Sequence, residues 1–530
     1  MEKPRGICCV IILLCFTFVF SDILDEQNAR HWNEIGDAEL KSALNLRMNT
    51  NVAKNVILFL GDGMGISTIT SSRIYKGQKD NKPGEESKLS FDKFPYVSLI
   101  KTYSVSKQVP DSAATATAFL TGVKTRNGMI GLTAKAKVGV CKSSKGNEIS
   151  SIMEWSQNEG KDTGLVTTTR VTHATPAALY AHTVHRDWEC DDDVPADSTG
   201  CLDIARQLVE EIPGKNAKVI FGGGRRKFLP KTVTDYQSNQ TGQRKDGRNL
   251  IEVWKMDKKN RNNKYTYVTN LKQFNEIDVA NADYALGLFN YDHMQYELER
   301  NTGEDGEPSL ADMTEKAIDI LKKSQKGFFL LVEGGRIDHG HHVSSAIKAL
   351  EDTVAFSLAI SRALNKVNLD ETLIVVTADH SHVLTINGYP NRGNPILGIA
   401  DVSDMDNKSY TTLMYTNGPG FNLINGERPD AKDENTTSPN YIQYSGVPLK
   451  SETHGGEDVA LFAIGPMAHL FHGVHEQVYI ARVMGYASCV GSNKDHCSSS
   501  STYQSSSSST CTPSKFILCI ILIYIFKNFG

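Results

Sequence analysis

The segment from Asp338 to His342 (DHGHH) is dense in side chains that bind zinc. Asp338 and His342 are four residues apart, so one helical turn would place them on the same side. His454 lies in a THGG sequence, where the two glycines allow close approach of the backbone. Asp338, His342 and His454 together form an oxygen–nitrogen–nitrogen set that leaves one coordination position open, as catalytic zinc sites do.

Two further sets combine acidic, histidine and hydroxyl side chains. Asp379 and His380, with Asp62, form an oxygen–nitrogen–oxygen set. Asp62 and Glu333, with the Thr175 hydroxyl, form an all-oxygen set that suits Mg²⁺. Any one of these residues alone is as easily a helix cap or a hydrogen-bonded core residue. The whole constellation indicates a centre with several metal ions.

Two more residues have the chemistry to act on phosphate. Ser112 lies in the small-residue segment PDSAATATA, which we expect to be helical after its proline. At a helix N-terminus, free N–H groups and the dipole attract phosphate, and a metal ion activates a serine hydroxyl. Arg186, in HTVHRDW, offers a guanidinium that binds two phosphate oxygens. Taken singly, Ser112 would be an N-cap and Arg186 a surface ion-pair residue.

The elements that would position these residues alternate along the chain. Short continuous apolar runs, typical of strands buried on both faces of a parallel sheet, occur at 55–60, 162–169, 218–221, 327–332 and 372–377. Helical patterns cover 309–323 and 344–367. The alternation predicts an α/β fold with a central, mostly parallel sheet flanked by helices. Asp62, Glu333 and Asp379 each follow a predicted strand, so we expect them at the sheet edge where such folds bind ligands.

The catalytic region, which we place at 51–497, contains one insertion and is preceded by an arm. Residues 389–452 are rich in Asn, Gly, Pro and Tyr and interrupt the path between Asp379 and His454, so we expect a surface insertion. Residues 22–50 predict an amphipathic N-terminal arm with Trp32, Leu40, Leu44 and Leu46 as its apolar positions.

The two ends of the chain carry targeting patterns. A basic start and the apolar run 7–20 predict a signal peptide over 1–21. A serine-rich linker (498–515) and an apolar tail (516–530) predict a GPI anchor, with attachment near 505–508 and removal of the tail. A plain linker with a short hydrophobic tail is the alternative. These patterns predict the extracellular face of the cell membrane.

Charge and cysteines narrow the function further. The net charge is −4 and no basic block occurs, which argues against nucleic-acid binding. In an oxidising compartment Cys489 and Cys497 would close a small loop, and Cys141 would pair with Cys190 or Cys201. No CxxC pair supports a zinc ribbon. Glycosylation sequons occur at Asn239, Asn407 and Asn435.

Four segments resemble the alkaline phosphatases, most closely the animal GPI-anchored enzymes: PDSAATATA, VEGGRIDHGHH, TADHSH and ETHGGED. The resemblance runs from the N-terminal arm to Cys497. It implies a homodimer in which the arm embraces the partner and the insertion forms a crown. It also implies hydrolysis of phosphate monoesters through a phosphoserine.

The resemblance assigns a role to each candidate residue. Ser112 would become the phosphoserine, and Arg186 would clamp the phosphate. One zinc would be held by Asp338, His342 and His454, the other by Asp62, Asp379, His380 and Ser112, and magnesium by Asp62, Thr175 and Glu333. His173 and His339 would lie close to the magnesium.

Two alternatives remain open at this stage. A phosphodiesterase, nucleotide pyrophosphatase or sulfatase of the same superfamily is the first, although Arg186 and three metal sets favour monoesters. An anchored surface-binding protein is the second.

A structural calcium is a further implication of the resemblance. Animal relatives often hold it with carboxylates and a backbone carbonyl. Phe289 fits the carbonyl position and Glu307 can replace an aspartate. However, Asn290 stands where the resemblance implies a glutamate, and the loop after Gly224 is shorter than in those relatives. The sequence therefore leaves the calcium site undecided.

Overall fold

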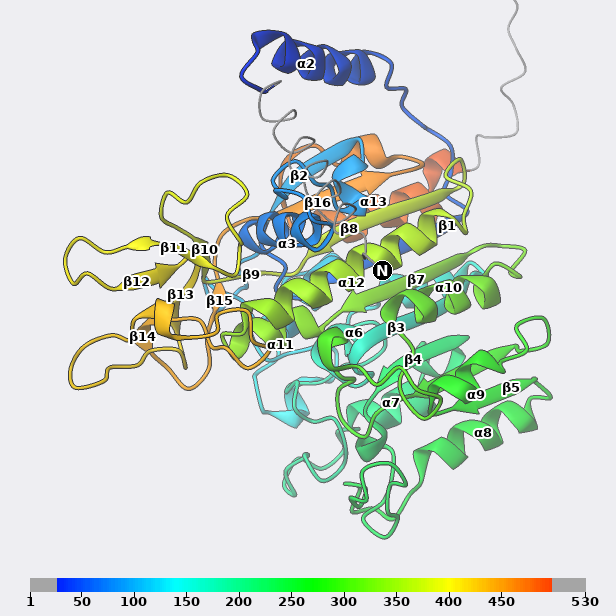
Figure 1. The fold of residues 1–530 in the computed structure, drawn as a ribbon. Helices are drawn as coiled ribbons and strands as arrows, with labels where there is room; N and C mark the ends of the chain where they lie inside the picture. The colour runs from blue at the N-terminus through cyan, green and yellow to red at the C-terminus, as the bar shows by residue number, and fades with distance from the viewer. Residues whose placement is uncertain (1–25, 498–530) are drawn as a thin grey trace, which may run out of the picture. The chain divides into compact units, whose positions relative to one another are not determined.

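A ten-stranded sheet forms the centre of the structure (Figure 1). The structure is a computed structural model that describes residues 26–497. The predicted signal peptide, serine-rich linker and apolar tail lie outside the described residues. The strand order is β17 (Gly473–Glu476), β2 (Tyr96–Lys101), β16 (Val459–Ile464), β8 (Thr372–Ala378), β1 (Asn55–Gly61), β7 (Phe328–Gly334), β3 (Asp162–Arg170), β4 (Val219–Gly223), β6 (Tyr284–Leu288) and β5 (Tyr265–Val268).

The sheet is mostly parallel, as predicted. The seven neighbours from β8 to β5 run parallel, and β16 is antiparallel to both β8 and β2. Every residue of β1, β7 and β8 is buried, which explains their unbroken apolar sequences. All five predicted strands are present, with ends within two residues of the predicted ones.

Helices cover this sheet. They are α3 (Ile66–Lys79), α4 (Ser112–Thr121), α5 (Ile152–Asn158), α6 (Ala174–Ala177), α7 (Ile204–Glu210), α8 (Leu250–Asn260), α9 (Leu271–Asn275), α10 (Leu310–Leu321), α11 (Arg336–His342), α12 (Ala346–Leu364) and α13 (Tyr479–Ser488). Helices α10 and α12 correspond to the two predicted helices and pack against each other over the strands (Figure 1). Phe356 of α12 packs edge-on against Phe59 of β1.

The register of the central strands places the acidic residues together. Gly61 at the end of β1 pairs with Gly334 of β7 and with Ala378 of β8. Asp62, Glu333 and Asp379 therefore lie at one edge of the sheet, at the carboxyl ends of adjacent strands, which confirms the expectation from the sequence.

The segment between Asp379 and His454 builds its own small sheets. Strands β10 (Leu384–Ile386), β13 (Leu413–Gly418) and β14 (Ser445–Pro448) form one, and β11 (Ile399–Val402) and β12 (Ser409–Thr411) form another. Leu384, Leu413 and Tyr415 form a separate apolar cluster with Leu350 of α12. This cluster fixes the segment to the helix that follows the metal-binding motif.

The predicted arm contains helix α2 (Ala29–Leu44), none of whose residues is buried. Trp32, Leu40 and Leu44 are each more than half exposed, at 54%, 59% and 77%. Among residues 26–497, no helix has the length and apolar character to span a membrane.

The structure decides the cysteine pairing that the sequence left open. Cys141 is bonded to Cys201, and Cys190 is a buried free thiol. Cys489 and Cys497, expected to close a small loop, are both disulfide-bonded. The sequon residues Asn239, Asn407 and Asn435 are all exposed.

Candidate active site

The turn after β1 brings Asp62 to the site because Gly63 follows it. Gly63 has a φ of +66°, and a Cβ at this position would lie 2.4 Å from the ring of His382. Its N–H donates to Asp379 Oδ1 at 3.0 Å. Only glycine tolerates both the left-handed backbone and this close approach, so the turn joins the Asp62 and Asp379 ends of two neighbouring strands.

Asp338, His342 and His454 meet as the sequence predicts, with α11 supplying the first two. His342 Nε2 lies 3.4 Å from Asp338 Oδ2, and His454 Nε2 lies 3.3 Å from Asp338 Oδ1. The two Nε2 atoms are 3.2 Å apart. Each ring places its Nδ1 against a backbone carbonyl, that of Glu452 at 2.6 Å and that of Pro110 at 2.7 Å. A carbonyl only accepts, so both Nδ1 atoms carry the proton and both Nε2 lone pairs face each other. The two Nε2 lone pairs and the Asp338 carboxylate therefore form a donor set that suits a divalent cation.

His382 is a member of this group that the sequence analysis did not assign. Its Nε2 lies 2.7 Å from Asp338 Oδ1 and its Nδ1 2.6 Å from Glu452 Oε2. Burial opposes the charged ring, but Glu452 and Asp338 outweigh it and raise the pKa of His382 to about 10. His454 is positioned through the same residue, since β15 (His454–Gly455) pairs with β9 (Ser381–His382). The available signal was TADHSH, in which His382 follows His380 by two residues.

The second predicted set surrounds the Ser112 hydroxyl. Ser112 Oγ lies 3.1 Å from His380 Nε2 and 3.4 Å from Asp62 Oδ1. His380 Nε2 is also 3.1 Å from Asp379 Oδ2. All four residues are at most 2% exposed. A cation bound among these atoms would contact the serine oxygen directly.

The third set contains buried polar atoms without partners. Asp62 Oδ2, Glu333 Oε1 and Thr175 Oγ1 are buried and make no hydrogen bond. Leaving such atoms unsatisfied is costly, whereas oxygen ligands of this kind suit Mg²⁺. His173 Nδ1 is also unpartnered, and ligand atoms of Asp62, His173 and Glu333 lie within 4.8 Å of one another. Burial raises the pKa of Glu333 to about 7.

The electrostatics of the three sets favour bound cations. Burial raises the pKa of Asp62 well above its usual value, and the charges of Asp379 and Asp338 add to the effect. Burial opposes ionisation of Asp338 and Asp379 as well, but His342 lowers the pKa of Asp338, and His380 lowers that of Asp379 to about 2. Several carboxylates in one buried space require cations to be ionised together.

Ser112 is the first residue of α4, and Asp111 is its N-cap. The Asp111 carboxylate accepts from Ala114 N at 3.1 Å. Ser112 is therefore not the N-cap of this helix, because Asp111 takes that position. Its hydroxyl is free to face the metal-binding side chains while it sits at the positive end of a ten-residue helix.

Arg186 contacts two residues beside the site, Asp111 and His173. Its Nη1 lies 3.2 Å from Asp111 Oδ2, and its Nη2 lies 3.2 Å from His173 Nε2. Its side chain keeps 22% exposure, so it lies at the mouth of the buried site. This position beside the N-cap of α4 suits a clamp on phosphate oxygens.

His339 lies next to His173, and a third histidine joins them. The rings of His173 and His339 are 5.5 Å apart, and His293 lies 5.3 Å and 4.3 Å from them. Burial lowers the pKa of all three, and Arg170 adds to the effect, so the rings are neutral. His293 had no motif around it, and only its packing reveals it.

The chain is similar to several known proteins. A family model described as alkaline phosphatase matches residues 53–490. The tissue-nonspecific alkaline phosphatase of Felis catus is 51% identical over 485 residues, covering 90% of the chain and 92% of that protein. The alkaline phosphatase of Gadus morhua is 50% identical over 477 residues, covering 88% and 99%. The structure of a TAB5 alkaline phosphatase mutant with Mg bound is 24% identical, with a TM-score of 0.59 and coverage of 84% and 100%, which shows likeness of fold.

Proposed function

The chain belongs to the alkaline phosphatase family and hydrolyses phosphate monoesters, and we propose that it does so through a phosphoserine at Ser112. The observation that carries the proposal is the Ser112 hydroxyl at the N-terminus of α4, 3.1 Å from His380 and 3.4 Å from Asp62. The seryl oxygen bonds to phosphorus and loses its proton to water, while the bond to the alcohol breaks and the alcohol takes up a proton. Water then attacks the same phosphorus, and the seryl oxygen leaves and regains a proton.

The residues around Ser112 divide the remaining work. Arg186 binds two non-bridging oxygens and holds the phosphorus in line with the seryl oxygen. Asp111 and His173 orient that guanidinium before substrate arrives. The free N–H groups at the start of α4 add positive potential next to the phosphate. Each of the two displacements inverts phosphorus, so the whole reaction retains configuration.

The enzyme is metal-dependent, and its donor atoms support two zinc ions and one magnesium ion. Asp338, His342 and His454 would hold one zinc, with His382 orienting Asp338. The other zinc would be held by Asp62, Asp379 and His380, and magnesium by Asp62, Thr175 and Glu333. Bound there, such ions lower the pKa of a hydroxyl or water and neutralise charge on phosphate oxygens.

The test is hydrolysis of p-nitrophenyl phosphate by wild type and Ser112→Ala, before and after chelation and zinc and magnesium repletion. We expect wild type to lose activity on chelation and regain it, and Ser112→Ala to stay severely impaired while retaining its metals. Comparison with an aryl diester and an aryl sulfate separates the superfamily alternatives. Failure of the repleted wild type on the monoester would overturn the proposal.

We also propose a homodimer on the outer surface of the cell membrane, held by a GPI anchor after passage through the secretory pathway. The exposed apolar face of α2 supports the dimer, because Trp32, Leu40 and Leu44 have no covering partner within the described residues. The terminal sequence patterns, the Cys141–Cys201 disulfide and three exposed sequons support the location. Release by a phosphatidylinositol-specific phospholipase C tests the anchor.

A further inference from the structure

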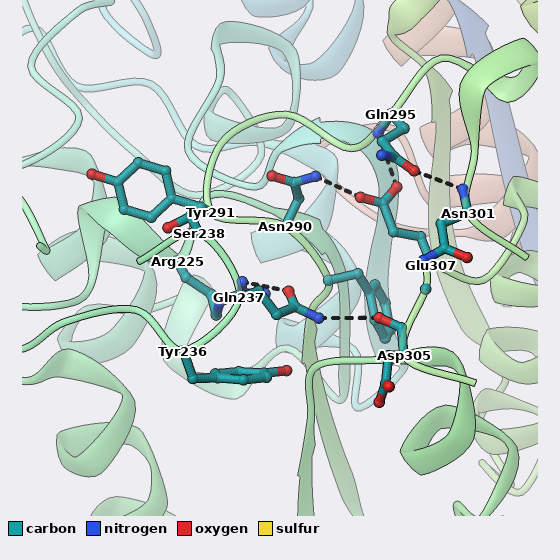
Figure 2. Close-up of a pocket in the computed structure, with 12 residues that line it drawn as sticks. Arg225, Tyr236, Gln237, Ser238, Asn290, Tyr291, Gln295, Asn301, Asp305 and Glu307 are labelled. Atoms are coloured by element: carbon teal, nitrogen blue, oxygen red, sulfur yellow. Dashed lines mark hydrogen bonds between the residues drawn. The ribbon is translucent and has the colours of Figure 1, made fainter. Parts of the chain in front are cut away.

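A cavity of about 660 Å³ opens between the loop 225–238 and the segment 289–307 (Figure 2). None of the residues that line it belongs to the three metal-binding sets. It contains Phe289, Asn290 and Glu307, the positions at which the family resemblance implies a structural calcium. Its side chains therefore allow a direct test of whether this chain fits that ion.

Glu307 already has both carboxylate oxygens occupied by N–H donors. Asn290 Nδ2 donates to Oε1 at 2.5 Å, and the backbone N–H of Gln295 donates to Oε2 at 2.9 Å (Figure 2). Glu307 is only 4% exposed. The carboxylate is thus satisfied by protein hydrogen bonds.

Asn290 cannot offer its oxygen by turning its amide round. Its Oδ1 accepts from the backbone N–H of Asp292 at 3.0 Å, while its Nδ2 donates to Glu307. A flip would break both bonds and set two oxygens against each other. The amide nitrogen therefore faces Glu307, and nitrogen of this kind is no ligand for calcium, which takes oxygen.

Arg225 places a permanent positive charge at the same cavity. Arg225 is 1% exposed, and its guanidinium binds Asp235 with Nε at 2.6 Å and Nη2 at 3.1 Å. Its Nη1 donates to the Leu288 carbonyl at 2.7 Å, and its Nη2 donates to Gln237 Oε1 at 2.6 Å. Arg225 thereby ties the loop 225–238 to the end of β6, and its guanidinium presents only N–H donors, which cannot bind a cation.

Gln237 links the loop 225–238 to the segment 289–307. Its Nε2 lies 3.3 Å from the Asp305 carbonyl and 3.5 Å from the Thr269 carbonyl. The carboxylates that line the cavity are Asp305, which is exposed, and Glu307. One exposed carboxylate and one that is already hydrogen-bonded at both oxygens are a poor set for calcium, which takes six to eight oxygen ligands.

We infer that these contacts take the place of a calcium ion, so that the stability of this chain does not depend on calcium. Arg225 and Gln237 join the loop 225–238 to the neighbouring segment, and the hydrogen bond between Asn290 and Glu307 ties together the two ends of the segment 289–307. The residues do not fit the ion that the family resemblance implies. The inference concerns the fold around the cavity and is independent of the phosphoserine proposal.

The test compares calcium binding and thermal unfolding of the zinc- and magnesium-loaded protein in calcium-free and millimolar-calcium buffers. We expect wild type to retain no radioactive calcium on equilibrium dialysis and to show the same Tm in both buffers. Asn290→Glu, which supplies the missing carboxylate, should gain a calcium-dependent rise in Tm. The inference would be overturned if calcium raised the Tm of wild type as much as that of Asn290→Glu, and if Glu307→Gln abolished the rise in wild type.

A second arm tests the network itself. Asn290→Ala leaves Glu307 Oε1 buried without its donor and should lower the Tm by about 1–3 °C in calcium-free buffer. Asn301→Ala is the matched control, since Asn301 lines the same cavity and its side chain makes no hydrogen bond to Glu307. Activity on p-nitrophenyl phosphate should be unchanged in both variants. A Tm for Asn290→Ala equal to that of wild type would contradict the role given to the network.

Discussion

Arg186 is oriented by two neighbours before any phosphate arrives, which makes its fork geometry testable. Arg186→Lys keeps the charge but loses the planar pair of donors. We expect kcat/KM for p-nitrophenyl phosphate to fall about 10–100-fold, the value of one or two charge-assisted hydrogen bonds. Competitive inhibition by inorganic phosphate should weaken in parallel, as steady-state kinetics would show. Arg126→Lys, at an exposed arginine, should change neither quantity. Unaltered phosphate inhibition in Arg186→Lys would remove the clamp from the mechanism.

At the residue scale, residue types and short spacing predicted most members of the site. Asp338 and His342 share one helix, and Asp379 and His380 are adjacent, so local spacing was sufficient for them. His382 was missed because its role depends on Asp338, 44 residues earlier, and Glu452, 70 residues later. Asp111 was missed for the same reason. Besides Ala114 it binds Arg186, which is 75 residues away.

At the element scale, the turn after β1 should tolerate no side chain at Gly63. Gly63→Ala forces a Cβ into the His382 ring as well as into a left-handed backbone. We expect activity to fall at least tenfold and zinc to be held less tightly, because His382 orients Asp338. Gly139→Ala is the matched control, with a φ of +73° and nothing within 4 Å of its Cβ. It should cost about 1–2 kcal/mol of strain and leave activity intact. Equal activity in both variants would contradict this account of the turn.

Helix α12 carries a buried carboxylate that makes stability depend on pH. Burial raises the pKa of Asp352 to about 8, despite the nearby charge of Arg336. The folded chain then holds a proton that the unfolded chain releases near pH 4, so stability falls as the pH rises from about 4 to about 8. Asp352→Asn removes this loss and can still accept from Glu297 N, as Asp352 does at 3.1 Å.

We therefore expect Asp352→Asn to gain about 1–3 kcal/mol over wild type between pH 5.5 and pH 8.5. Denaturant unfolding at the two pH values measures the difference. Asp370→Asn, at an exposed position, is the control and should track wild type. A gain that is the same at both pH values would show that Asp352 is not the titrating group.

Strand prediction succeeded for five neighbouring strands at the centre of the sheet and missed others, including the fully buried β6. The five predicted strands lie side by side as β8, β1, β7, β3 and β4, where both faces are covered. Strand β2 (YVSLIK) alternates between exposed and buried residues, and β5 has four residues with one buried, so neither shows a continuous apolar run. Their place in the sheet comes from pairing with β16 and β6, which is not local in sequence.

At the scale of the whole molecule, the arm should determine the oligomeric state. Removing residues 26–47 or introducing Trp32→Ser with Leu40→Ser takes away the exposed apolar face of α2. We expect light scattering to find a dimer for wild type and a shift towards monomer for both variants. Glu34→Gln, whose carboxylate pairs with Arg30 on the same helix, should stay dimeric. A monomeric wild type, or variants that remain fully dimeric, would contradict the proposed role of the arm.

The phosphoserine mechanism requires the seryl oxygen to attack phosphorus before water does. The most direct measurement is the stereochemistry at a phosphorus made chiral with oxygen isotopes, when the metal-loaded enzyme transfers the phosphoryl group from an aryl ester to an alcohol acceptor. Two in-line displacements, one at Ser112 and one by the acceptor, predict retention of configuration. Inversion would show that the acceptor attacks the substrate directly, and the phosphoserine would be excluded.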